Sequence, residues 1–321
     1  MYYIVFHCIK KTGDELIHCP DGIAAASVVF AALKKCDILD ENIQILGDVH
    51  RSSNEYEPIP PFDIYPFVKD DGVCIIDFSY PASWMRYWID EGVDLTIIDH
   101  HADKFNELSQ FSQAILDQTE CGATLAWKEF FPNTPIPHIL KDVKRRDIGF
   151  DGYYEGLIPQ SEAFNEGLAS WRNAFGSTWD LVAAYSSLII RCAVKPAFED
   201  GVYAALLPLG VKKMEYRDKI VDEACSRYSF KGISDGEKSY LVPYVFLNEA
   251  EARYVSVIGN ALAKRYAKTS FAWCETNNGH NLRSTKDSQV DIVQLAKYHG
   301  GGGHPRAAGF SKLTINQQKK E

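Results

Sequence analysis

A run of side chains that could bind metal follows an apolar segment at residues 96–103, TIIDHHAD. Asp99, His100 and His101 stand side by side directly after a β-branched stretch that is typical of a strand. Burying polar side chains at the end of a strand is unfavourable unless a partner satisfies them. Carboxylates and imidazoles are common ligands of divalent metal ions. The run therefore indicates a metal-binding site at the end of a strand.

Three further acids stand at comparable places. Asp77 ends the apolar run VCIID, Asp21 opens the Ala-rich segment in HCPDGIAAA, and Asp147 closes a helical segment in VKRRDIGF. Each has a structural alternative, since an acid before a helix is often an N-cap and an acid after a strand is often part of a loop. Carboxylates that approach one another repel unless cations lie between them.

This pattern favours a particular class of metal chemistry. Asp and His ligands without a set of cysteines favour Mn²⁺ or a similar divalent ion over structural zinc. One acid shared by two ions about 3.5–4 Å apart is the usual arrangement for phosphoryl chemistry. The residues alone therefore indicate a two-metal hydrolase.

Alternating strands and helices must position these residues. Strands are predicted at 2–7, 43–48, 73–78 and 95–100, and helices at 21–36 and 81–92. Continuous apolar strands that alternate with helices predict an α/β fold with a parallel sheet covered by helices on both faces. The carboxyl ends of such strands meet at one edge, where ligands bind.

Length and composition predict two domains in a reducing compartment. The 321 residues, 46% of them hydrophobic, suffice for a parallel-sheet domain over 1–185, a helical connector over 186–235 and a smaller α/β domain over 236–321. Eight cysteines without a CxxC pair predict free thiols and a cytoplasmic location. Neither a secretory signal nor a membrane-spanning stretch is expected. The net charge of −9 argues against wrapping a long nucleic acid.

A glycine cluster marks the predicted C-terminal domain. Gly300–Gly303 precede His304, and four glycines in a row lose much backbone entropy on folding. The cluster is either a flexible loop or a nest of backbone N–H groups that binds an anion. Arg306 lies beside it, and Arg283 and Ser284 lie in LRST. Arginine can hold a phosphate through two parallel hydrogen bonds.

Together these landmarks resemble the DHH phosphoesterases that carry a C-terminal DHHA1 domain. HCPDGIAAA resembles the first motif of this family, IIDFSY the second, DHH itself the third, and RRDIGF the fourth. CGATLAW at 121–127 resembles a helix of the DHH domain, while VIGNALAK, LRST and GGGGHPRAAGF resemble the DHHA1 domain. The resemblance implies a parallel-sheet DHH domain, a smaller α/β DHHA1 domain and a metal-dependent phosphoesterase.

The resemblance also implies roles for single residues. The implied ligands of two divalent ions are Asp21, Asp77, His100 and Asp147, with either His7 or His18. The residues implied to bind the nucleotide part of the substrate are Arg283, Ser284, Gly301, Gly302, Gly303, His304 and Arg306. Asp77 would bridge the ions, and Asp99 would orient His100. His101 would meet the scissile phosphate or its leaving group. Mn²⁺ is expected, with Mg²⁺ and Co²⁺ as alternatives.

The first motif departs from the family pattern. The family has a strand-end histidine one residue before DCPDG, whereas the ten residues CIKKTGDELI separate His7 from HCPDG here. His18 also stands where the family has an aspartate. His7 is the expected ligand, and His18 is the alternative if the inserted loop folds back.

The expected activity is hydrolysis of phosphodiester bonds in short oligonucleotides or cyclic dinucleotides. The CPDG form and the short chain resemble the nano-RNA (oligoribonuclease) and cyclic-nucleotide phosphodiesterase branch. The alternatives are a phosphomonoesterase acting on a nucleoside bisphosphate and a degenerate member that binds a nucleotide without turnover. The expected partner is a nucleotide or short oligonucleotide, with no long nucleic acid and no membrane. Whether the chain forms a homodimer is left open.

Overall fold

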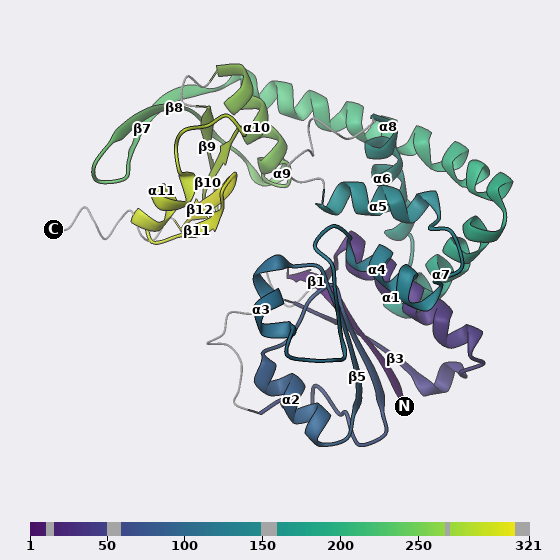
Figure 1. Ribbon diagram of the computed structural model, residues 1–321. Coiled ribbons are helices and arrows are strands. Elements are labelled where there is room, and N and C mark those ends of the chain that lie inside the picture. The colour runs from purple at the N-terminus through teal and green to yellow at the C-terminus, as the bar shows by residue number, and fades with distance from the viewer. Residues whose placement is uncertain (11–15, 50–58, 149–158, 267–269, 312–321) are drawn as a thin grey trace. The chain divides into compact units, whose positions relative to one another are not determined.

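The computed structural model describes residues 1–10, 16–49, 59–148, 159–266 and 270–311. The chain divides into two compact units, Met1–Val211 and Lys212–Glu321, shown in Figure 1. Each unit has its own sheet, with a hydrophobic core on each side of the first sheet and two cores in the second unit.

The first unit alternates strands and helices along the chain. Its strands are β1 (Tyr2–Lys10), β2 (Leu16–His18), β3 (Ile43–Asp48), β4 (Gly72–Ile76), β5 (Asp94–Asp99) and β6 (Ala114–Leu116). Its helices before residue 150 are α1 (Pro20–Lys35), α2 (Ala82–Asp90), α3 (Phe105–Leu108), α4 (Gly122–Phe130) and α5 (His138–Asp147), with short 3-10 turns at Asp40–Asn42 and Ala102–Lys104. Three further helices follow: α6 (Pro159–Arg172), α7 (Thr178–Val194) and α8 (Pro196–Ser226).

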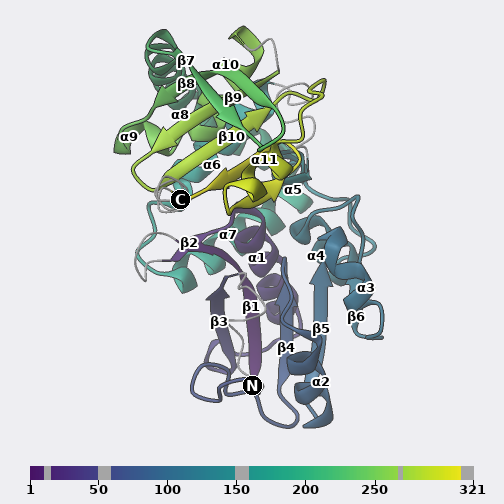
Figure 2. The same ribbon diagram turned by 90° about the vertical axis from the view of Figure 1, so that its left-hand side faces the viewer.

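The sheet of this unit is parallel, as predicted. Strands β3, β1, β4, β5 and β6 pair in that order, all parallel, and lie side by side in Figure 2. The short β2 pairs antiparallel with the end of β1. In this register Phe6 pairs with Ile76, and Ile76 pairs with Ile98. The residues that follow these three positions therefore emerge at the same edge of the sheet.

Helices cover both faces of this sheet because side chains along each strand alternate between two cores. Ile4 and Phe6 of β1 pack into one core with α1, α4, α5 and α7. Tyr3 and Val5 point to the opposite face, where α2 closes a second core with its tryptophans. This alternation follows from the two-residue period of a strand. The predicted α/β class is confirmed.

The second unit is a smaller α/β fold with a mostly antiparallel sheet. Its strands are β7 (Ser229–Ser234), β8 (Ser239–Phe246), β9 (Phe271–Thr276), β10 (Gly279–Ser284), β11 (Gly302–His304) and β12 (Ala307–Phe310). Its helices are α9 (Glu249–Ala252), α10 (Val255–Tyr266) and α11 (Ile292–Tyr298). The strand order is β11-β12-β10-β9-β8-β7, and only the pair β8–β9 is parallel. Helices α10 and α11 belong to different cores of this unit.

The predicted helical connector over 186–235 includes a strand of the second sheet. The second sheet begins at Ser229, before the predicted domain start at 236, because the hairpin of β7 and β8 spans that position. Most residues of β7 are exposed, so the strand carries little apolar signal in the sequence. The break between the two units falls inside α8, at Val211 and Lys212. None of the helices in the described part of the chain is long and apolar enough to span a membrane.

Candidate metal centre

The carboxyl ends of three central strands bring the predicted residues together. His7 follows Phe6 in β1, Asp77 follows the last residue of β4, and Asp99 ends β5. His7 also pairs with Asp48, the last residue of β3. The parallel register alone therefore places four polar side chains in one row.

Asp77 lies at the centre of the cluster and contacts a histidine on each side. Its Oδ1 is 3.1 Å from His100 Nε2, and its Oδ2 is 3.5 Å from His7 Nδ1. The side chain is almost fully buried. The backbone of Asp77 has a positive φ of 64°, which is uncommon for a residue other than glycine but tolerated by aspartate. One carboxylate oxygen thus faces each of two histidines, as a bridging ligand would.

A second group of ligand atoms converges beside Asp77. His100 Nε2 is 3.3 Å from Asp147 Oδ2 and 3.9 Å from Asp21 Oδ2. Ligand atoms of these three residues lie within 4.8 Å of one another. His100 directly follows β5, while Asp21 and Asp147 belong to α1 and α5, so the tertiary fold assembles residues that are far apart in the sequence.

Asp21 does not cap its own helix. The N-cap of α1 is Cys19, and Asp21 lies inside the first turn. Its two carboxylate oxygens accept hydrogen bonds from the backbone amides of Gly122, at 2.6 Å, and Ala123, at 2.9 Å. These amides form the N-terminus of α4, where the helix dipole favours a negative charge. The carboxylate is thereby fixed beside the cluster.

The cluster concentrates negative charge that the protein itself leaves unsatisfied. Oδ2 atoms of Asp77, Asp99 and Asp147 are buried and accept no hydrogen bond. Burial, and then the charge of Asp77, raise the pKa of Asp147 to about 6, and the same two causes raise the pKa of Asp21. Burial alone would raise the pKa of Asp77 as well, but contacts with His100 and His7 hold it below its ordinary value. Orphaned buried carboxylate oxygens beside imidazole nitrogens fit divalent cations.

Asp99 orients a different histidine from the one expected. Its Oδ1 accepts hydrogen bonds from His101 Nδ1 at 2.7 Å and from the His101 backbone amide at 3.1 Å. The expectation that it would brace His100 is therefore wrong. In extended backbone the side chains of residues i and i+2 share a face, whereas His100 points to the opposite side. Burial would lower the pKa of His101, but the hydrogen bond and charge of Asp99, with the charges of Asp77 and Asp147, raise it to about 9, which favours the protonated imidazole.

The structure separates the two candidates for the first motif. His7 lies next to Asp77, whereas His18 Nε2 is hydrogen-bonded to Thr178 Oγ1 at 3.0 Å. The ring of His18 also lies 5.8 Å from the ring of Phe6. Among the described residues, the candidate ligand groups contain His7 and do not contain His18. Between these two residues lies the inserted loop, of which residues 11–15 are outside the described part.

We expect His7→Ala and His18→Ala to have different effects on metal content. His7→Ala removes an imidazole that faces Asp77 and should reduce the bound divalent ions from two to one. His18→Ala removes one partly buried hydrogen bond, which contributes about 1 kcal/mol to stability, and should leave both ions bound. Metal content after dialysis, measured by atomic emission, tests this. The opposite result would assign the ligand to His18.

Three features of the centre were not predicted. Cys19 contributes a sulfur atom to the group formed by His7 and Asp77. Gly122 has no room for a side chain, since an added Cβ would lie 2.9 Å from Asp77 Cβ. Asp48 is buried and accepts hydrogen bonds from the hydroxyls of Tyr65 and Tyr80. Cys19 belongs to the motif HCPDG and Gly122 to the motif CGATLAW. The motifs alone do not predict that these two residues lie next to Asp77.

The glycine cluster in the second unit is partly committed to structure. The amide of Gly301 donates to the Ala296 carbonyl at 2.8 Å and that of Gly300 to the Lys297 carbonyl at 2.9 Å, so both amides terminate α11. Gly302 and Gly303 belong to β11, which pairs with β12. Fewer backbone N–H groups are therefore available to bind an anion than the sequence predicts, because hydrogen bonds of α11 and of the β11–β12 pair use several of them. The His304 side chain lies outside the described part of the chain.

The arginine and serine of LRST are held within the second unit. Arg283 donates to Ser256 Oγ at 3.0 Å and to the Leu282 carbonyl at 2.8 Å. Ser284 donates to the Pro305 carbonyl at 3.2 Å, and its amide donates to the carbonyl of Arg306. The contacts of Ser284 join LRST to the chain that follows the glycines. A role in substrate binding stays a prediction.

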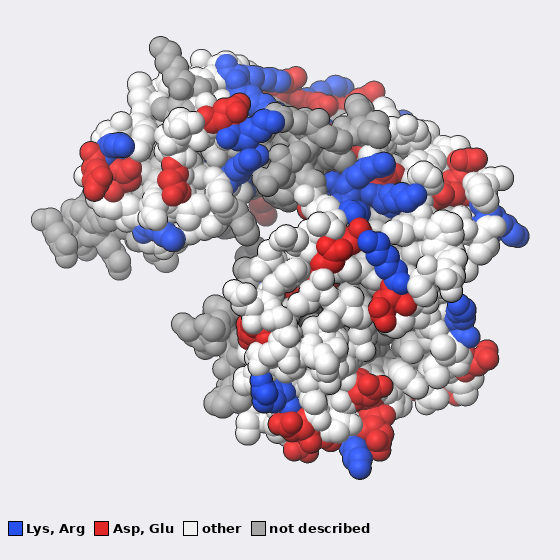
Figure 3. All heavy atoms as spheres, viewed as in Figure 1, with Lys and Arg blue, Asp and Glu red and all other residues white. Residues whose placement is uncertain are grey.

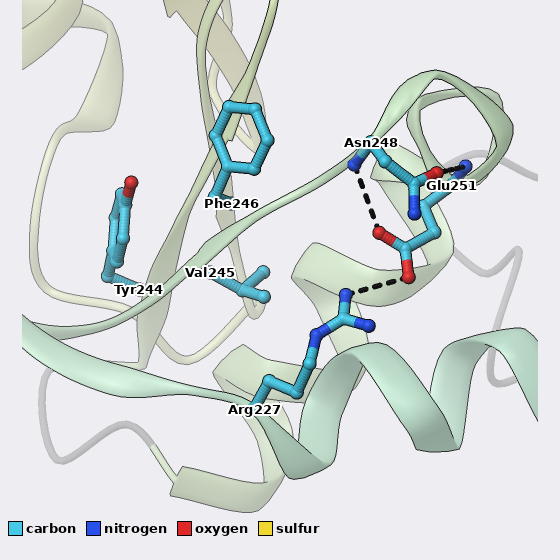
Figure 4. Close-up of a pocket in the computed structure, with 6 residues that line it drawn as sticks. All are labelled: Arg227, Tyr244, Val245, Phe246, Asn248 and Glu251. Carbon is cyan, nitrogen blue, oxygen red and sulfur yellow. Dashed lines mark hydrogen bonds and ion pairs between the residues drawn. The ribbon is translucent and has the colours of Figure 1, made fainter.

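A cavity of about 370 Å³ lies elsewhere in the second unit, at the end of β8 (Figure 4). Its lining residues are Arg227, Tyr244, Val245, Phe246, Asn248 and Glu251. Arg227 donates to Glu251 at 2.7 Å, and the Asn248 amide donates to the same carboxylate at 3.0 Å. Its charged groups thus satisfy each other, and none of the predicted site residues lines it.

Comparison with solved structures defines the class of fold. The DHH domain of a protein described as a member of a family of ribosomal proteins matches with a TM-score of 0.54 and 11% identity. The match covers 99% of this chain and 85% of that chain. The chain therefore has the fold of a DHH-domain protein. No protein-family model matches the chain.

Two further proteins are similar to this chain. The uncharacterized protein R106 of Acanthamoeba polyphaga mimivirus is 24% identical over 304 residues, which are 92% of this chain. The chain spans 65% of the length of that viral protein. RecJ from Thermus thermophilus, solved in complex with Mn²⁺, matches with a TM-score of 0.47 and 11% identity, over 99% of this chain and 51% of that chain.

Proposed function

We propose that this protein is a phosphodiesterase that uses two divalent metal ions to hydrolyse phosphoester bonds in short oligonucleotides or cyclic dinucleotides. The observation that carries the proposal is the position of Asp77. One of its oxygens faces His7 and the other faces His100, which itself lies next to Asp147 and Asp21. A carboxylate shared between two ligand groups is the arrangement that two-metal phosphoryl chemistry requires.

The residues present fit two cations. His7 and Asp77 would hold one ion, and Asp21, His100 and Asp147, with Asp77 as the bridge, would hold the other. Mn²⁺ suits the group of Asp21, His100 and Asp147, whose ligand atoms are oxygen and nitrogen. When bound, such ions supply Lewis acidity that activates water and neutralises charge on the phosphoryl oxygens.

His101 is placed to act on the substrate. Asp99 holds its Nδ1, which directs the opposite edge of the ring, with Nε2, away from that carboxylate. The ring lies 4.4 Å from the His100 ring and 6.5 Å from the His7 ring, and a ring nitrogen of His101 forms a further candidate ligand group with Asp77 and His100. Because the hydrogen bond to Asp99 favours the protonated imidazole, His101 can donate a hydrogen bond to a phosphate oxygen or a proton to a leaving group.

Charge supports a short substrate. The chain carries 43 acidic and 34 basic residues, whereas proteins that hold long nucleic acids rely on cationic surface. On the face drawn in Figure 3, small groups of basic side chains lie next to acidic ones in both units. Metal ions held at Asp77 would provide enough positive charge to bind and neutralise a single phosphodiester group.

Hydrolysis of a labelled RNA ladder from dinucleotide to pentanucleotide, with and without Mn²⁺, tests the proposal. Cyclic dinucleotides and 3′-phosphoadenosine 5′-phosphate complete the panel. We expect Mn²⁺-dependent cleavage of the shortest RNAs or of the cyclic dinucleotides. Cleavage of the bisphosphate alone would replace the proposal with a phosphomonoesterase. Binding of these nucleotides without any turnover would show a protein that has lost catalysis.

A further inference from the structure

We infer that the thiolate of Cys19 is a metal ligand, together with His7 and Asp77, and that this position selects a thiophilic divalent ion such as Zn²⁺ or Co²⁺. The inference rests on the proposed function only in that it requires a metal ion at this cluster. It changes the expectation for one of the two ions, since the sequence indicated oxygen and nitrogen ligands alone.

The geometry brings three different donor atoms together. A ring nitrogen of His7, the sulfur of Cys19 and a carboxylate oxygen of Asp77 lie within 4.8 Å of one another. Cys19 is buried, 8% exposed, and directly precedes Pro20, the first residue of α1. A thiol that coordinates a divalent ion does so as the thiolate, because the metal displaces its proton.

An independent observation points to a ligand at the same place. Asp77 Oδ2 is buried and accepts no hydrogen bond, although it is an oxygen of an almost fully buried carboxylate. His7 Nδ1 lies 3.5 Å away, an ion-pair contact that is longer than an ordinary hydrogen bond. A buried carboxylate oxygen without a donor is unfavourable unless a cation lies beside it.

The backbone holds these donors rigidly. An added Cβ at Gly22 would lie 2.4 Å from the His7 carbonyl oxygen, so the first turn of α1 packs directly against β1. This approach holds the first turn of α1, of which Cys19 is the N-cap, against His7. Of the eight cysteines, only Cys19 belongs to a candidate ligand group within the part of the chain that the structure describes.

The donor set distinguishes the two metal positions. Soft thiolate ligands select Zn²⁺ and similar ions, whereas carboxylates and imidazoles also accept Mn²⁺. The group of Asp21, His100 and Asp147 contains no sulfur, so it remains suited to Mn²⁺. The structure thus favours a centre with one sulfur-containing position and one that binds through oxygen and nitrogen alone.

Cobalt spectroscopy on the full chain tests this without relying on activity. The protein is stripped of metal with a chelator and titrated anaerobically with Co²⁺ to two equivalents. We expect an intense near-ultraviolet sulfur-to-cobalt charge-transfer band in the wild type. Cys19→Ser should lose this band while keeping the visible d–d bands of bound Co²⁺. The same variant should weaken Zn²⁺ binding by more than about 100-fold, beyond what loss of a merely supporting group causes, and should weaken Mn²⁺ binding much less.

Two cysteine variants serve as controls. Cys8→Ser changes a buried thiol next to His7 in the sequence, and Cys36→Ser changes the exposed one. Both should keep the charge-transfer band. A band that persists in Cys19→Ser, or two bound Co²⁺ ions without any band in the wild type, would overturn the inference.

The outcome is separable from that of the proposed function. Mn²⁺-dependent cleavage of dinucleotides without the charge-transfer band would leave the function standing and refute the role of Cys19. The band without cleavage of any substrate would support the role of Cys19 and refute the function.

Discussion

We expect Asp77→Asn to lower the rate of metal-dependent phosphodiester hydrolysis by at least about 10³-fold, the scale seen when a group central to transition-state stabilisation is removed. Asparagine has nearly the same shape, so the fold should persist. It offers one oxygen and one NH₂ group where the carboxylate faces His7 and His100. An NH₂ group cannot bind a cation, so one bridging contact is lost together with the negative charge.

The measurement is the initial rate on the substrate that the wild type cleaves best, together with metal content after dialysis. Asp94→Asn is the matched control, because Asp94 is an exposed acid at the opposite end of β5. It should retain wild-type rate and metal content. If Asp77→Asn kept most of its activity and both metal ions, a bridging role for Asp77 would be excluded.

Gly122→Ala is expected to damage the centre without touching any ligand. The added Cβ would lie 2.9 Å from Asp77 Cβ and 3.0 Å from Asp21 Oδ2, two side chains that are themselves buried. Overpacking of this kind destabilises a protein by about 1–3 kcal/mol. Displacing two carboxylates by a fraction of an ångström should also lower the rate by roughly 10²-fold. Thermal unfolding with and without metal, and the hydrolysis rate, measure the two effects.

Gly201→Ala provides the comparison for this substitution. Gly201 lies in α8, and nothing lies within 4 Å of an added Cβ. Alanine there should leave the rate unchanged and increase stability slightly, because alanine favours helix more than glycine. Equal effects of the two substitutions would contradict the steric explanation for Gly122.

Much of the first unit could be predicted from local patterns. Continuous apolar strands such as VCII and LTII indicated the parallel sheet, since strands buried on both faces have this composition. The ends of those strands then placed Asp77 and Asp99 at one edge. By contrast, β7 was assigned to the connector, because a strand with mostly exposed residues has no apolar pattern to detect.

The sequence by itself determined which acids and histidines could form the centre, because strand ends and helix starts follow from short-range periodicity. Only the tertiary structure decided how they pair. Asp99 supports His101, Asp21 accepts the amides of α4, His7 and not His18 faces Asp77, and Cys19 joins the ligand group. These pairings depend on contacts between segments as far apart as Asp21 and Gly122, and on which face of extended backbone each side chain occupies. Residue spacing along the chain does not encode such distances, whereas the register of a parallel sheet and the packing of α1 against α4 fix them.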